Sequence, residues 1–239
     1  MPTLITGRRL DSRGQPIDGT GFTYDTDGPL AELLARRTSP LVSQPITGEW
    51  VFGLVTRAET GGAYERGAGV FPPGNAGPPE HIHPTYDEHF RIVQGEFVFR
   101  IGGQERGARA GDELVVSKGT PHTFRCVGSE HGALVVETRP AARTGAVICT
   151  LFGMAHEGLL TPQGQPKLLH AMVVGSEYAD DTVFTTPPPA VALTIARLLA
   201  PLARALGYRA VEPKYFEEAF WRAHVEQPAP VGTTAAHEC

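Results

Sequence analysis

The amino-acid sequence predicts a mainly β protein, an antiparallel β-barrel or sandwich with an α-helical C-terminal extension. Between residues 46 and 140, short apolar runs alternate with turns rich in Gly and Pro, as in small barrels and sandwiches. From residue 141 onward, apolar residues recur at the period of a helix. With 41% hydrophobic and 20% charged residues, the chain has the composition of an ordinary folded protein.

Residues 1–45 are expected to form an N-terminal arm with one short helix, from Pro29 to Arg37, which has proline at its first position. The β region follows over residues 46–140. Its clearest strands are expected at residues 50–56, 63–71, 97–101, 114–116, 123–127 and 133–137. The pair Gly102-Gly103 indicates a tight hairpin turn.

The helical extension is expected over residues 141–227. Its most apolar stretch, Ala190 to Leu206, is about 17 residues long and contains Arg197 and Pro201, whereas a membrane span needs about 20 uninterrupted apolar residues. We therefore expect a helix that packs on the barrel or on a partner subunit, and no membrane span. Residues 228–239 have little apolar content and are expected to form a flexible tail.

Charge and cysteine content exclude several classes of protein. The formal net charge is −5, and the sequence has no cluster of Lys and Arg residues. We therefore expect no nucleic-acid partner. The N-terminus lacks the apolar core of a signal peptide, and three cysteines do not make a disulfide framework. These features predict a reduced, cytoplasmic protein.

A cluster of metal-ligand residues lies in the middle of the β region. His81 and His83 are two residues apart, so on a strand their side chains point to the same face. Pro84 ends that ladder because it has no N–H to donate, and Glu88 returns on the next strand. A Gly/Pro-rich turn precedes His122 on a later strand. Two histidines alone would more often be core or surface residues, but these four together predict a metal site.

The ligand types narrow the choice of ion only to a group. Three imidazoles and one carboxylate suit one divalent transition ion per chain, Fe, Mn, Co, Ni, Cu or Zn, and do not choose among them. We prefer Fe because the first function considered below is that of an iron oxygenase. Without an ion, burying them would cost several kcal/mol of desolvation. His89 is next to Glu88 and is expected to point the opposite way, while Tyr86 and Asp87 in the turn are expected to face solvent.

The chain here resembles the cupin superfamily, over the region from Trp50 to Pro140. The first cupin motif, G-x5-H-x-H-x3,4-E-x6-G, is met at the three ligands and Gly95, with its opening glycine shifted; the second, G-x5-P-x-G-x2-H-x3-N, is met at Gly111, Gly119 and His122. Ser117 replaces the usual proline and Cys126 the usual asparagine; neither position is a ligand in the family. The resemblance implies a jelly-roll barrel, these four residues as metal ligands, and a homodimer.

Other side chains are expected to surround the ion. Cys126 lies four residues after His122 and shares its inward face with Phe124. We expect Cys126 to be either a small buried hydrophobe or a thiol close to the ion, with Phe124 and Phe90 also beside the ligands.

Function follows from the open coordination positions. Four protein ligands on an octahedral ion leave two positions, which suit either O₂ and a substrate or a chelating substrate. We expect an enzyme that acts on a small organic molecule, first a mononuclear non-haem oxygenase. A metal-dependent isomerase, cyclase or lyase is the alternative, and a non-catalytic small-ligand-binding protein is the third possibility.

Overall fold

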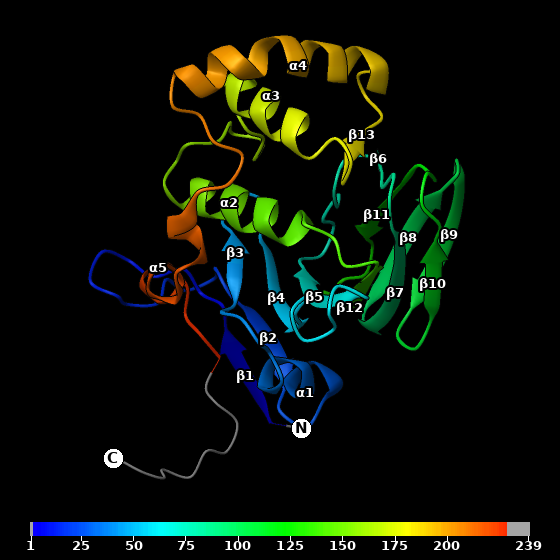
Figure 1. Cartoon of the computed structure of the whole chain (residues 1–239). Coiled ribbons are helices and arrows are strands. Elements are labelled where there is room, and N and C mark those ends of the chain that lie inside the picture. The colour runs from blue at the N-terminus through cyan, green and yellow to red at the C-terminus, as the bar shows by residue number, and fades with distance from the viewer. Residues whose placement is uncertain (1, 229–239) are drawn as a thin grey trace.

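A computed structural model describes residues 2–228 as two facing antiparallel sheets with helices stacked along one side (Figure 1). Mainly β architecture with helices after the β region is therefore confirmed. Most of the tail predicted at 228–239 lies outside the described residues.

The two large sheets are built from consecutive and crossing strands. In spatial order, the six-stranded sheet contains β10 (Glu113–Val116), β7 (Asp87–Gln94), β12 (Gly132–Arg139), β5 (Glu65–Phe71), β4 (Glu49–Val55) and β3 (Val42–Gln44). The five-stranded sheet contains β13 (Val183–Phe184), β6 (His81–Ile82), β11 (His122–Cys126), β8 (Glu96–Ile101) and β9 (Gln104–Arg109).

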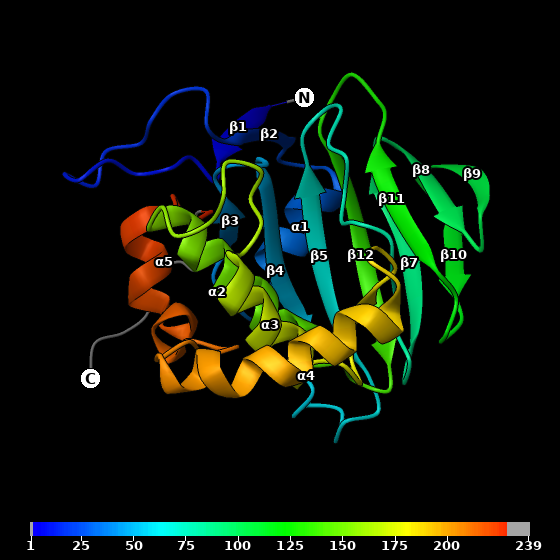
Figure 2. The ribbon, with the colours of Figure 1, turned by 90° about the horizontal axis from the view of Figure 1, so that it is seen from above.

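The predicted closed barrel is wrong for the described residues, because no ladder joins the two sheets. The six-stranded sheet extends past its partner through β4 and β3, as both views of the ribbon show (Figures 1 and 2). Helix α2 (Thr144–His156) packs beside β3. Helix α2 and the N-terminal elements thus cover the apolar surface of β3 and β4. In a closed barrel, the sheet would bury such surface against itself.

Two glycine turns set the strand connections near the site. Gly95, between β7 and β8, has φ +77°, and a Cβ there would lie 2.8 Å from the Cα of Gly132, so only glycine fits. Gly102 and Gly103 both have positive φ and join β8 to β9, as predicted for a two-residue hairpin turn.

The N-terminal elements cover the outer face of the six-stranded sheet. They comprise β1 (Thr3–Thr6), β2 (Phe22–Asp25) and α1 (Pro29–Ala35), which confirms the short helix expected at Pro29. Phe22, Leu30 and Leu34 are almost fully buried against Trp50 and Phe52 of β4. The described N-terminal region therefore contributes several residues to this first core.

A second core fills the space between the two sheets. Its buried residues alternate along the strands, as on β11, where Phe124 and Cys126 are buried and Arg125 is exposed. Phe97 and Phe99 of β8 meet these residues from the neighbouring strand. This alternation is the expected two-residue period of a strand with one buried face, and it continues to His122.

The C-terminal extension returns to the first core and to the edge of the five-stranded sheet. Its elements are α2, α3 (Leu168–Glu177), β13, α4 (Pro189–Ala205), a 3₁₀ turn (Pro213–Phe216) and α5 (Glu218–His224). Trp221 is 1% exposed in the first core. Helix α4 packs against α3, and Figure 1 shows the two helices together at the top of the molecule. The described residues contain no helix long and apolar enough to span a membrane.

The apolar stretch of α4 packs differently from the prediction. Its small residues face α3, with Ala200 and Ala203 fully buried. The large side chains lie on the opposite face and are 41–72% exposed: Val191, Ile195, Leu198, Leu202 and Leu206. Within the single chain these large side chains are therefore not buried, because alanines make the close helix contact, and packing on a partner subunit stays a prediction.

Candidate metal centre

The four predicted ligands converge between the two sheets. One ligand atom from each of His81, His83, Glu88 and His122 lies within 4.8 Å of the others. His81 and His122 are directly paired on β6 and β11, His83 follows β6, and Glu88 points across from β7 of the facing sheet. The two strands with histidines thus meet the one strand with a carboxylate at one end of the second core.

Each histidine ring is oriented by a hydrogen bond at Nδ1. The Nδ1 atoms lie 2.8 Å from the Pro79 carbonyl for His81, 3.0 Å from the Asp181 carbonyl for His83, and 2.9 Å from the Thr120 carbonyl for His122. A carbonyl oxygen only accepts, so each Nδ1 must carry the proton. In the neutral rings, all three Nε2 atoms then offer a lone pair, which is how metal-bound histidines are commonly held.

Glu88 faces two of these Nε2 atoms. Its Oε2 lies 2.8 Å from His122 Nε2 and 3.2 Å from His83 Nε2. A carboxylate oxygen and an imidazole lone pair repel each other unless a proton or a cation lies between them. The two rings and Glu88 therefore require positive charge at this point.

Burial and these neighbours move the pKa values of the cluster apart. Burial and the two other imidazoles lower the pKa of His81 to about 4. For His83, burial lowers the pKa, but the nearby Glu88 carboxylate outweighs it and raises the pKa. Burial raises the pKa of Glu88, and the two imidazoles outweigh it, so the net shift is downward. The carboxylate is thus held in its charged form, as metal ligation requires.

The residues present fit a metal ion. The buried Nε2 of His83 makes no hydrogen bond within the described residues, although buried polar atoms are nearly always paired. His81, His83 and His122 are at most 8% exposed, and the Glu88 side chain is 12% exposed. The site therefore offers three nitrogen donors and one oxygen donor, the set that suits a divalent transition ion.

The other expected site residues lie at different distances from the cluster. The Phe90 ring packs edge-on against His122, with centroids 6.5 Å apart, and Phe124 packs against Phe90. Cys126 lies at the far end of β11, roughly 13 Å of strand from His122, where its Sγ would contact a Cβ on Gly132. The structure brings Phe90 to the ligands, places Phe124 behind it, and does not bring Cys126 there.

Tyr86 corrects the sequence-based expectation of a solvent-facing side chain. It is 2% exposed, and its ring stacks on His83 at 4.3 Å with an interplanar angle of 22°. Its hydroxyl is 2.8 Å from Thr144 Oγ1 and donates to Asp181 Oδ1 at 3.3 Å. The turn after Pro84 therefore folds inward. By contrast, His89 pairs with Glu137 on β12, one residue out of phase with Glu88, as predicted.

Sequence reasoning missed the contribution of the C-terminal extension. Asp181 contacts His83 across 98 positions of chain, and the Phe184 ring lies 6.3 Å from that of His81. Neither residue belongs to a motif or has ligand spacing. The only sequence signal was that an acidic residue precedes a short β-branched and aromatic run, Thr182-Val183-Phe184, which is too short to identify as a strand.

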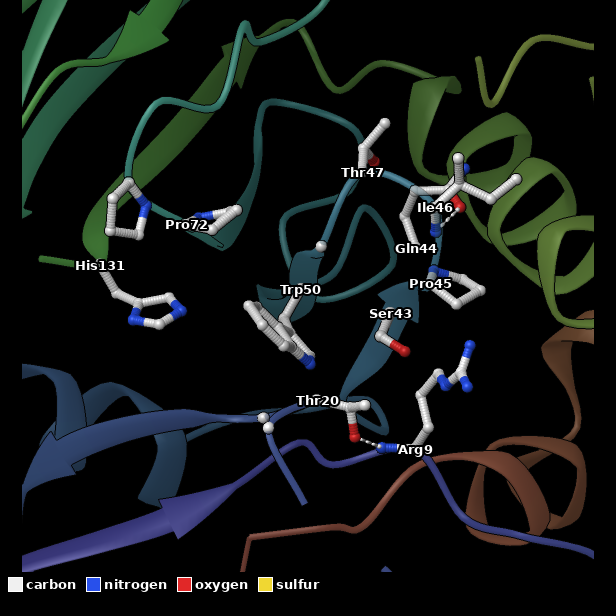
Figure 3. A pocket seen from close by; sticks show the side chains of 14 residues that line it. Arg9, Thr20, Ser43, Gln44, Pro45, Ile46, Thr47, Trp50, Pro72 and His131 are labelled. Atoms are coloured by element: carbon white, nitrogen blue, oxygen red, sulfur yellow. Dashed lines mark hydrogen bonds between the residues drawn. The ribbon is translucent and has the colours of Figure 1, made fainter. Parts of the chain in front are cut away.

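A pocket of about 500 Å³ lies elsewhere, between the N-terminal elements and the outer sheet face (Figure 3). Figure 3 shows Arg9, Thr20, Ser43, Trp50 and His131 around it. It shares no residue with the metal-ligand cluster, and its lining contains no carboxylate. The set of metal-ligand residues therefore lies between the sheets and not in this pocket.

Comparison with known families agrees with the motifs. Residues 69–137 match the family model described as "Cupin domain", and this span contains all four clustered residues. Residues 69–137 of the chain are thus identified as a cupin domain. No curated protein matched the chain.

Several solved structures are similar to parts of the chain. A cupin from Shewanella frigidimarina described as RmlC-like is 20% identical, with 45% of this chain and 89% of that one covered and a TM-score of 0.39. A predicted oxalate decarboxylase from Thermotoga maritima is 20% identical, covering 43% and 92%, with a TM-score of 0.39. The polyketide cyclase RemF from Streptomyces resistomycificus is 13% identical, covering 43% and 69%, with a TM-score of 0.35.

Proposed function

We propose that the protein is a metal-dependent enzyme acting on a small organic molecule, and that it is a mononuclear non-haem oxygenase using iron. The observation that carries the metal-dependent part is the convergence of three inward Nε2 lone pairs on one buried carboxylate. The oxygenase part is supported by the apolar surroundings, since Phe90 and the aromatic core behind it present no acid or base to the cluster.

In this proposal the protein residues hold and shield the centre. His81, His83, His122 and Glu88 would hold the ion, which when bound would supply Lewis acidity and, as iron, redox chemistry with O₂. The backbone carbonyls at Nδ1 keep each ring in the tautomer that binds metal. Phe90 and Tyr86 cover the ligands and exclude water from them, which strengthens every charge interaction at the site.

The test is O₂ consumption by the iron-loaded protein. Protein reconstituted with Fe²⁺ without air would be mixed with a panel of small catechols, thiols and dicarbonyl compounds, then exposed to O₂ in an oxygen electrode. We expect at least one compound to give O₂ uptake that requires both iron and Glu88. Turnover of a panel compound under nitrogen, with no O₂ uptake, would contradict the oxygenase proposal.

The alternative proposal, a metal-dependent isomerase, cyclase or lyase, is favoured by Glu65. Glu65 pairs with Thr138, which pairs with Glu88 on its other side; directly paired residues share a face of the sheet. Burial and the nearby Asp181 carboxylate raise the pKa of Glu65 to about 7, a value that suits proton transfer. Thr138, which lies between these two residues in the sheet, accepts a hydrogen bond at its Oγ1 from the Ala142 N–H.

The nitrogen arm of the same screen tests this alternative. Turnover without O₂ that is lost in Glu65→Gln, while the metal content is unchanged, would support it. Binding of a panel compound without turnover in either gas would instead support a non-catalytic small-ligand-binding protein.

We further propose a homodimer formed through the exposed face of α4. An apolar stripe that large is unusual on a monomer, and the cupin resemblance also implies a dimer. In this proposal residues 46–140 form the cupin unit and residues 141–227 form the helical extension. We also propose that the protein is cytoplasmic, which cell fractionation would test. A single species of monomer mass in sedimentation at micromolar concentration would contradict the dimer.

A further inference from the structure

The segment that joins α3 to α4 passes over the metal-ligand cluster. Val183 and Phe184 pair with Ile82 and His81 as an added edge strand, and the Thr185 N–H donates to the Glu80 carbonyl at 3.0 Å. This part of the extension is therefore hydrogen-bonded along the strand that carries His81. Figure 1 shows β13 and β6 together beneath the helices.

Asp181, just before this strand, orients the His83 ring from a distant part of the chain, whereas the rings of His81 and His122 are oriented from within their own segments. The Nδ1 of His81 and that of His122 each donate to the carbonyl two residues earlier in their own segment. The Nδ1 of His83 donates to the Asp181 carbonyl, with Thr182 Oγ1 a further 3.2 Å contact. The tautomer of this one ring therefore depends on the position of the extension.

The Asp181 carboxylate fixes that position. It is 4% exposed as a residue, and Oδ2 accepts from the Arg143 N–H at 2.7 Å. Its Oδ1 accepts from Thr144 Oγ1 at 2.6 Å and from the Tyr86 hydroxyl at 3.3 Å. Since Tyr86 stacks on His83, Asp181 restrains the ring both at Nδ1 and through the residue that covers its face.

We propose that Asp181 is a positioning residue of the metal centre, so that the C-terminal extension completes the site. This inference rests on the proposed metal binding. The carboxylate anchors the segment to the start of α2, and the anchored carbonyl then directs the His83 Nε2 lone pair toward the ion. Hydrogen-bond partners of metal-ligating histidines typically change metal affinity by about 10- to 100-fold.

Asp181→Ala in the full chain tests the proposal, with Co²⁺ as the probe. Competition with a chelator would give the Co²⁺ affinity, and the visible absorption of bound Co²⁺ would report the ligand geometry. We expect an affinity loss of about 10- to 100-fold and a changed spectrum. Asp181→Asn keeps an oxygen that can accept from Thr144 and Tyr86, so it is expected to bind Co²⁺ more tightly than the alanine variant.

Asp180→Ala is the matched control. The Asp180 side chain is 72% exposed and pairs with Arg143 at the surface. The Co²⁺ affinity and spectrum of this variant should therefore equal those of the wild type. If Asp181→Ala is insoluble, Tyr86→Phe removes the hydroxyl that contacts Asp181 and Thr144 in the same network and should still alter the Co²⁺ spectrum. If folded Asp181→Ala has the Co²⁺ affinity and spectrum of the wild type, the proposal is overturned. The same result for Tyr86→Phe overturns it if Asp181→Ala cannot be studied. Absence of Co²⁺ binding by the wild type would instead overturn the metal centre itself.

Discussion

Glu88→Ala is expected to lower the affinity for a divalent transition ion by at least about 100-fold, since even partners that only orient ligands change affinity by about 10- to 100-fold. Glu88 is the one anionic donor among the four clustered residues. Without it, three neutral imidazoles remain, and the charge that offsets a divalent ion in this buried place is lost. Chelator competition with Co²⁺, run beside the wild type, measures the effect.

Glu113→Ala is the matched control for this variant. Glu113 is an exposed carboxylate on β10, the strand that pairs with the one carrying Glu88. The same change of charge and volume there should leave the affinity for Co²⁺ unchanged. Equal affinities in Glu88→Ala and Glu113→Ala would mean that Glu88 is not a ligand.

Trp221→Ala is expected to lower the free energy of unfolding by about 3–5 kcal/mol, the usual cost of truncating a buried aromatic residue. Trp221 lies in α5, far along the chain from the sheets, yet it is 1% exposed in the core beneath the six-stranded sheet. Its Nε1–H donates to the Tyr215 carbonyl at 2.8 Å. The substitution removes both the packing and a buried donor, and denaturant unfolding measures the loss.

Phe216→Ala is the control for the stability of the extension. Phe216 belongs to the same C-terminal region but is 47% exposed, so its loss should cost about 1 kcal/mol or less. A Trp221 variant as stable as the Phe216 variant would show that the end of the chain is not integrated into the core.

The four clustered residues could be predicted because their geometry is local. The two-residue period of extended chain sets His81 beside His83, although β6 itself ends at Ile82. Pro84 follows, and Glu88 returns on the next strand. Two short turns, at Gly95 and before His122, decide which strands neighbour each other. Such features are written within a few residues of each ligand, so alternation and turn chemistry are enough to place them.

The surroundings of the cluster could not be predicted in the same way. Asp181 reaches His83 only because a two-residue strand of the extension pairs with β6, and strands that short leave no periodic signal. Tyr86 turns inward because its hydroxyl finds Thr144 and Asp181. Both contacts are decided by tertiary packing between segments far apart in the sequence.

The arrangement of the two sheets could not be predicted from local sequence patterns either. Alternation identifies strands with one buried face, but a closed barrel and two facing sheets require the same alternation. The difference lies in β3 and β4, which α2 and the N-terminal elements cover. In α4 the helix was predicted, but which face packs was not, because small alanines allow closer helix contact than the leucines opposite them.

Elemental analysis of purified protein tests the metal centre most directly. The wild-type chain, after incubation with Fe²⁺, Co²⁺ or Zn²⁺ and removal of loosely bound ions, should retain about one transition ion per chain. The His81→Ala/His83→Ala double variant should retain almost none, because two of the four clustered donors are absent. A double variant that keeps one ion per chain, or a wild-type protein that keeps none, would contradict the metal centre.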